Sequence, residues 1–119
     1  MKKLLLILLF GFSTLFAFED ITADNFDQKV KNKNVIVDFY YTWWPACDAL
    51  GKSLTKYNTS KTKDVTIYKV NLENQKALAK RFKIEAWPVL MYLKDGEVRL
   101  KRMGISSAKE IEEDVKVAF

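Results

Sequence analysis

The chain has 119 residues, of which 49% are hydrophobic and 13% aromatic, so it is long and apolar enough for one folded domain. Its formal net charge of +5 is spread along the sequence, which argues against a nucleic-acid-binding protein. It contains one cysteine and no histidine, which excludes an internal disulfide, a Cys–His catalytic pair and the usual zinc sites.

Residues 1–17 have the composition of a secretory signal peptide. Lys2 and Lys3 form a basic start, an almost wholly aliphatic stretch follows, and Ala17 is a small residue at the expected cleavage position. The alternative is that the segment is retained as an uncleaved membrane anchor. The apolar run is, however, shorter than the roughly 20 residues that a membrane-spanning helix needs. Cleavage would leave 18 basic and 15 acidic residues, a net charge of +3. The sequence therefore predicts a signal peptide, a mature domain at 18–119, and an exported protein, periplasmic in a Gram-negative bacterium.

The first half of the mature chain alternates between amphipathic stretches and apolar runs typical of buried strands. We expect a short opening strand near residues 18–21, followed by a short helix capped by Thr22 or Asp24 that carries Phe26 and Val30 inward. A strand at 35–40 comes next, and then a helix that begins at Pro45. This helix places four residues on one stripe, Cys47, Leu50, Leu54 and Tyr57, and a loop at 58–64 follows it.

The second half adds a strand at 65–70 and a helix that we expect Asn74 to cap. Two further strands flank Asp95-Gly96, a pair of residues typical of a tight hairpin. Ser107 and Glu110 form the pattern of a capping box at the start of a last helix. Alternating strands and helices give parallel pairing, and a hairpin adds an antiparallel edge. The expected fold is α/β, a mixed sheet of four to five strands with helices on both faces.

Three segments of the sequence resemble the thioredoxin family, and the likeness covers nearly the whole mature chain. The apolar strand around Asp38 is similar to the family's central strand with its buried aspartate. Trp43 stands where the family keeps a tryptophan before its two-cysteine motif, and Trp87-Pro88 is similar to the segment whose proline is cis and faces the active site. The resemblance implies the thioredoxin fold.

The sequence departs from the family's pattern at position 44. Where a thioredoxin has cysteine, two residues and cysteine, this chain has Trp44, Pro45, Ala46 and Cys47. The resemblance implies that the attacking cysteine is lost and that Cys47 matches the resolving one, with Asp38 as the carboxylate that helps to move its proton. Without both sulfurs, ordinary reductase or oxidase turnover should be absent.

Three uses of Cys47 remain open at this stage. It can be a small buried thiol, a thiol that takes one mixed disulfide with glutathione or a partner protein, or a soft metal ligand together with Met91 and Met103. Metal binding is the weakest of these, and we expect neither a metal site nor a cofactor. Because the second cysteine is missing, a dimer linked through Cys47 is also open.

The aromatic residues near the motif indicate a binding groove. Trp43, Trp44 and Trp87 would converge near Pro88, where the resemblance implies a site for extended substrate backbone. The first hypothesis is therefore an exported thioredoxin-fold protein of thiol–disulfide (redox homeostasis) pathways, limited to monothiol exchange at Cys47. The alternative is a non-enzymatic, chaperone-like module that binds peptide or protein in the old groove. The expected partners are protein or peptide thiols and disulfides, glutathione among them; nucleic acid is not expected, nor is a membrane unless the signal segment is retained.

Overall fold

A computed structural model of the protein describes residues 18–119, and the predicted signal peptide lies outside the described residues. Its elements, in chain order, are β1 (Glu19–Asp20), α2 (Phe26–Lys29), β2 (Asn34–Tyr40), α3 (Pro45–Ser60), β3 (Thr66–Asn71), α4 (Lys76–Arg81), β4 (Val89–Lys94), β5 (Glu97–Met103) and α5 (Ala108–Ala118). The order of elements agrees with the sequence-based prediction, including the short opening strand.

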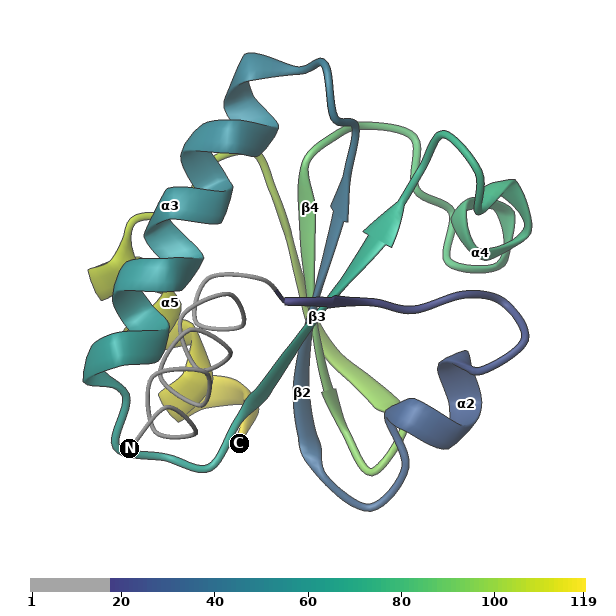
Figure 1. The fold of residues 1–119 in the computed structure, drawn as a ribbon. Helices are drawn as coiled ribbons and strands as arrows, with labels where there is room; N and C mark the ends of the chain where they lie inside the picture. Colours follow the sequence, from purple (N-terminus) through teal and green to yellow (C-terminus); the bar gives the residue numbers. More distant parts are fainter. Residues whose placement is uncertain (1–17) are drawn as a thin grey trace, which may run out of the picture.

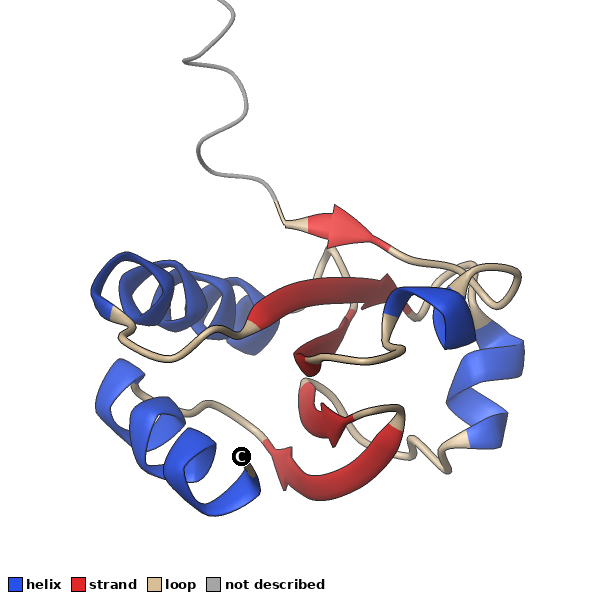
Figure 2. Cartoon of the chain, turned by 90° about the horizontal axis from the view of Figure 1, so that it is seen from below, coloured by secondary structure: helices blue, strands red, loops and turns tan. Residues whose placement is uncertain are grey.

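The five strands form one mixed sheet in the order β1-β3-β2-β4-β5. β1 and β2 run parallel to β3, whereas β4 runs antiparallel to both β2 and β5. Helices α3 and α5 cover one face of the sheet, and α2 and α4 cover the other (Figures 1 and 2). The predicted mixed sheet with helices on both faces is confirmed.

The alternation of side chains along β2 decides which residues face which helix layer. Val35, Val37 and Phe39 belong to the apolar cluster under α2 and α4. Ile36 belongs to the cluster under α3 and α5. Because successive side chains of a strand point to opposite faces, Asp38 shares the face of Ile36 and lies under the α3 layer.

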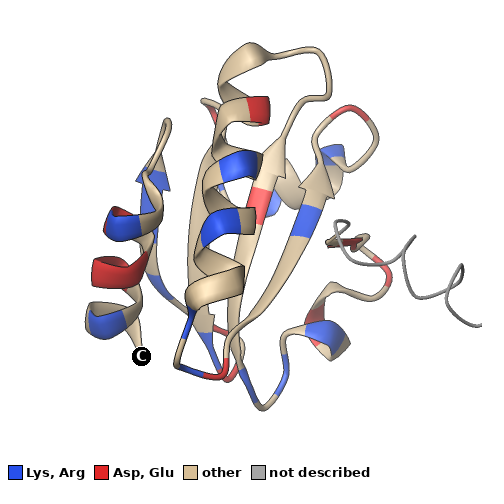
Figure 3. Ribbon diagram, turned by 60° about the vertical axis from the view of Figure 1, so that its left-hand side comes forward, with Lys and Arg blue, Asp and Glu red and all other residues tan. Residues whose placement is uncertain are grey.

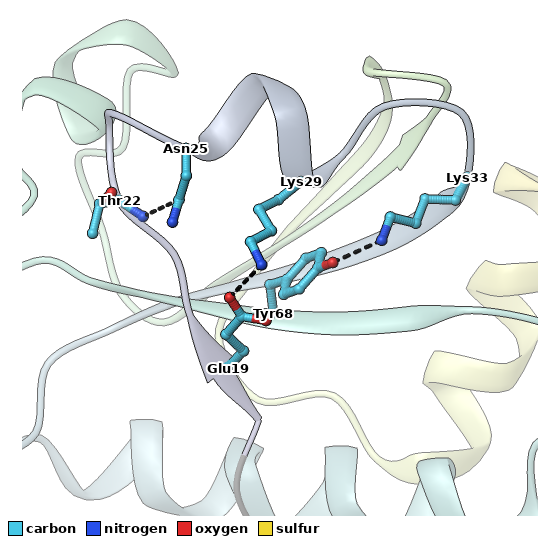
Figure 4. Close-up of polar contacts among 6 residues, drawn as sticks. All are labelled: Glu19, Thr22, Asn25, Lys29, Lys33 and Tyr68. Atoms are coloured by element: carbon cyan, nitrogen blue, oxygen red, sulfur yellow. Dashed lines mark hydrogen bonds and ion pairs between the residues drawn. The ribbon is translucent and has the colours of Figure 1, made fainter.

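Three helix boundaries differ from the predictions. α3 continues to Ser60, so the loop expected from residue 58 begins later; the hydroxyl of Thr59 donates to the carbonyl of Lys56, which satisfies this short polar side chain within the helix. The residue that precedes α4 is Gln75 rather than Asn74. At the start of α2, neither expected cap is used: Asn25 lies at the N-cap, and its side-chain oxygen accepts from the N–H of Thr22 at 2.8 Å (Figure 4).

Two polar contacts tie this N-terminal region to the sheet (Figure 4). Lys29 of α2 forms an ion pair with Glu19 of β1 at 2.7 Å. Lys33, just before β2, donates to the hydroxyl of Tyr68 in β3 at 2.8 Å. The short edge strand is therefore held by side chains as well as by its backbone pairing.

The hairpin and the last helix form as predicted. Asp95 and Gly96 both have positive φ, 52° and 83°, as a two-residue type I′ turn between β4 and β5 requires. The hydroxyl of Ser107 accepts from the N–H of Glu110, and the Glu110 carboxylate accepts from the N–H of Ser107. The hairpin turn and the capping box are therefore both formed by residues close together in the sequence.

Helices α3 and α5 each carry charged residues of both signs (Figure 3). The exposed edge strand β5 carries Arg99, Lys101 and Arg102, which discourages pairing with another sheet edge. Within residues 18–119, no helix is both long and apolar enough to cross a membrane.

Candidate functional site

Cys47 lies in the first turn of α3, at the end of the sheet to which β2 leads. Pro45 occupies the start of this helix, where its missing N–H costs no hydrogen bond. The cysteine is only 5% exposed and shares the buried stripe of α3 with Leu50, Leu54 and Tyr57, as predicted. Its Sγ accepts from the backbone N–H of Tyr41 at 3.4 Å. The thiol is therefore held against the loop between β2 and α3.

The surroundings of Cys47 favour the protonated thiol. Burial raises the pKa of Cys47 above its ordinary value, and the negative charge of Asp38 raises it further. The hydrogen bond from Tyr41 lowers the pKa of Cys47; this influence is weaker than burial but stronger than the charge of Asp38. The helix dipole also favours the thiolate, by about 0.3–1 kcal/mol. Any reaction of Cys47 at neutral pH therefore needs a group that accepts its proton.

Asp38 is a candidate for that group. Its side chain is 2% exposed, and Oδ1 has no hydrogen-bond partner among residues 18–119. Burial raises the pKa of Asp38 to about 7, although the neighbouring Lys69 lowers it in part. A carboxyl group with this pKa exchanges protons near neutral pH, which is where a general base works best.

Asp38 and Cys47 line the same open pocket, which has a volume of about 510 Å³ between α3 and the β2–β3 part of the sheet. Tyr40 and Lys69 contribute to the wall on the sheet side, and Gly51 contributes on the helix side. Asp38 is thus a lining residue of this pocket, and its Oδ1 is buried from solvent.

The register of the sheet places Lys69 beside Asp38. It pairs with Asp38 across the parallel strands β2 and β3, so both side chains project from the same face. Its Nζ lies 5.1 Å from the centre of the Tyr40 ring and 3.8 Å from the Asp20 carboxylate. The hydroxyl of Tyr40 donates to the same carboxylate at 2.8 Å. The pocket therefore has a mixed polar rim beside an aromatic wall.

The aromatic cluster, which we define as Tyr41, Trp43, Trp44 and Trp87, lies around the start of α3. Tyr41 joins its parts, because its ring centre lies 5.3 Å from that of Trp43 and 4.9 Å from that of Trp87. Trp43 and Trp44 meet edge to face at 5.5 Å. The exposed fractions are 61% for Trp43, 40% for Trp44 and 37% for Trp87. The structure thus brings the three tryptophans together on the surface.

Pro88 adjoins the aromatic cluster through Trp87, and the peptide bond between them is cis. The pyrrolidine is buried, and its carbonyl accepts from the N–H of Gly104 at 2.8 Å. The exposed part of this segment is the indole of Trp87. A partner at this surface would meet indole rings before it met the proline.

Sequence reasoning missed Tyr41, Lys69 and Gly51. Each has a feature in the sequence that could have drawn attention to it. Tyr41 belongs to the aromatic run before Pro45, and Lys69 interrupts an otherwise apolar strand. Gly51 lies in the middle of a helix, where glycine is unfavourable. It also missed the tether of the loop, since the N–H and hydroxyl of Thr42 both donate to the carboxylate of Glu73.

The residues considered for metal binding are not brought together. Met91 is fully buried in the core, whereas Met103 is 75% exposed at the end of β5. In the described part of the chain, His, Cys, Asp and Glu do not gather in groups of three that could hold an ion.

Comparisons with known proteins agree on one family. The thioredoxin family model matches residues 17–117. The chain is 32% identical to a thioredoxin of Mycoplasmoides gallisepticum over 85 residues, which cover 71% of this chain and 84% of that protein. It is 30% identical to the mitochondrial thioredoxin of Bos taurus over 106 residues, 87% of this chain and 63% of that protein. The crystal structure of a Malassezia sympodialis thioredoxin has the same fold, with a TM-score of 0.74 and 24% identity over 87% of this chain and 92% of that one.

Proposed function

This chain belongs to the thioredoxin family, and we propose from this premise that it performs thiol–disulfide exchange with a single thiol, Cys47. The sequence has no second cysteine, so the protein forms a mixed disulfide but does not close an internal one. A second thiol, from the substrate or from a small molecule, must release the bound partner.

The observation that carries this proposal is the shared pocket of Cys47 and Asp38. A buried carboxyl group without a hydrogen-bond partner is costly to a fold, which suggests a role beyond packing. Asp38 takes the proton of the Cys47 thiol, directly or through one solvent molecule, and the thiolate attacks the substrate disulfide. The sulfur–sulfur bond of the substrate breaks, and the departing thiolate takes up a proton.

The proposal is tested by trapping Cys47 in the native protein. We expect oxidised glutathione to form one adduct per folded chain, detected by intact mass, because the thiol borders an open pocket. Dithiothreitol should remove the adduct, and a Cys47→Ser variant should form none. A native protein that reacts neither with glutathione nor with iodoacetamide, yet does so once unfolded in urea, would leave only a buried structural thiol.

The exposed aromatic cluster favours a second candidate function, the binding of extended or unfolded polypeptide. Exposed tryptophans are common hot spots of protein interfaces, and three of them gather here. We expect an unfolded polypeptide such as reduced, carboxymethylated lactalbumin to quench the tryptophan fluorescence. Trp44→Ala should weaken this binding by roughly tenfold or more, as loss of a hot-spot residue does.

The matched control for this experiment is Val117→Ala, because Val117 is an exposed apolar residue of α5 outside the aromatic cluster. It should leave the affinity unchanged. Equal effects of the two substitutions would show that binding is not localised at the aromatic cluster.

We also propose that the protein acts outside the cytoplasm, after removal of residues 1–17. The basic start, the aliphatic stretch and Ala17 support export. Purified protein from the native cell should begin at Phe18, whereas an intact Met1 in the membrane fraction would indicate a retained anchor. A non-reducing gel of the same material distinguishes monomers from a dimer linked through Cys47.

A further inference from the structure

We propose that Cys47 is reached through the pocket beneath α3, whose lining includes Tyr41 but none of the three tryptophans, and that the pocket admits a small disulfide of the amino-acid type. Such a molecule carries both carboxylate and ammonium groups, as cystine and oxidised glutathione do. This inference rests on the proposed exchange at Cys47 and adds its entrance and its substrate class.

The first support is the position of Cys47 on the pocket wall. Cys47, Gly51 and Thr55 follow one another at intervals of four residues, so they form one stripe of α3, and all three line the pocket. Asp38 lies across from this stripe, with Oδ1 lacking a partner among the described residues. The lining of the pocket therefore contains both the sulfur and a carboxyl group whose Oδ1 has no described partner.

The second support is Gly51. A glycine inside a helix costs about 0.5–1 kcal/mol relative to alanine. Crowding does not require it here, because a Cβ at Gly51 would meet no described atom within 4 Å. The missing side chain instead leaves the pocket open next to Cys47.

The charges at the rim fit a zwitterionic ligand. Lys52 and Asp48 lie on the α3 side, 3.5 Å apart and exposed to solvent. Lys69 lines the opposite side. A cation on each side of the pocket and a carboxylate on the α3 side can bind the carboxylates and the ammonium group of one amino-acid disulfide.

The reaction follows from this placement. Asp38 accepts the Cys47 proton, and the resulting thiolate attacks one sulfur of the bound disulfide. The bond from Cys47 to that sulfur forms as the sulfur–sulfur bond of the ligand breaks. The second half of the ligand leaves as a thiolate and takes the proton, so Cys47 is oxidised and one equivalent of small thiol is released.

The test measures the rate at which native Cys47 forms the mixed disulfide with oxidised glutathione, by quenched mass spectrometry. Gly51→Leu places a side chain in the pocket and should slow this rate by about tenfold or more, as misplacing a reactant does. Lys56→Leu makes a similar change on the exposed side of α3, outside the pocket, and should react like the wild type. Should Gly51→Leu fail to fold, Thr55→Leu fills the same pocket from the next turn.

Two comparisons separate the possible failures. Lys52→Glu should slow the reaction with oxidised glutathione but not the reaction with the uncharged 2-hydroxyethyl disulfide. If the folded Gly51→Leu variant reacts as fast as the wild type while Trp44→Ala speeds the reaction, the thiol is reached from the aromatic side and the pocket proposal is wrong. If the wild type itself forms no mixed disulfide with either reagent, the exchange function fails, and the pocket proposal fails with it.

Discussion

The residue that most needs explanation is Asp38, because a buried carboxyl group without a partner destabilises the protein when it is ionised. Its pKa is raised from 3.8 to about 7, mainly by burial. Between these two values the folded state binds more protons than the unfolded state, so the stability falls as the pH rises from about 4 to about 7. Above pH 7 the whole penalty is present.

Replacement of this carboxyl group should therefore stabilise the protein in a pH-dependent way. We expect Asp38→Asn to increase the free energy of unfolding by about 2–4 kcal/mol at pH 8, since each unit of pKa shift corresponds to about 1.4 kcal/mol. At pH 4 the two proteins should be nearly equal. Urea unfolding across this range measures the difference, in which contributions from the other titrating groups cancel. Parallel stability curves would mean that Asp38 does not titrate as described.

The burial of Cys47 could be predicted from the sequence, whereas the exposure of the tryptophans could not. The stripe of α3 follows from helical spacing alone. Trp44 stands at the position of the lost cysteine, yet Trp43 is the more exposed. The loop that carries Trp43 is held by contacts between residues distant in the sequence, from Tyr41 to Trp87 and from Thr42 to Glu73.

At the scale of secondary structure, α3 combines the site and its pocket in one helix. Its start is set by Pro45, and its buried stripe fixes its rotation on the sheet. Gly51 interrupts neither feature, since the helix continues to Ser60. The sequence predicted the start and the stripe, but not the later end, because short polar side chains are as typical of loops as of a final helical turn.

The presence of Gly51 in the middle of α3 leads to a prediction about the stability of the protein. Gly51→Ala should raise the free energy of unfolding by about 0.5–1 kcal/mol, because alanine loses less backbone entropy and its Cβ has space. Urea unfolding of the variant measures this gain. A loss of stability would show that the backbone at Gly51 is strained or that the pocket is narrower than described.

At the scale of the whole molecule, the mixed sheet and both helix layers could be predicted from general rules. Alternating strands and helices, the hairpin at Asp95-Gly96 and the charged edge strand determine them. The pocket could not be predicted in this way. It depends on how α3 lies over β2 and β3, and on a lysine whose neighbours are set by the strand register.

The central proposal is that this site differs from a working thioredoxin site by one sulfur atom, whose place is taken by the Trp44 indole. Trp44 is the N-cap of α3, where the helix N-terminus stabilises a thiolate. Asp38 and Cys47 line one pocket, and the Trp87-Pro88 peptide bond is cis.

The most direct test is the Trp44→Cys variant, assayed for catalysis of insulin disulfide reduction by dithiothreitol, with Trp44→Ser as the matched control. We expect the introduced cysteine and Cys47 to form a reversible disulfide, and the variant to accelerate insulin reduction well above the control. A folded Trp44→Cys protein that closes no disulfide and is no faster than Trp44→Ser would contradict the proposal.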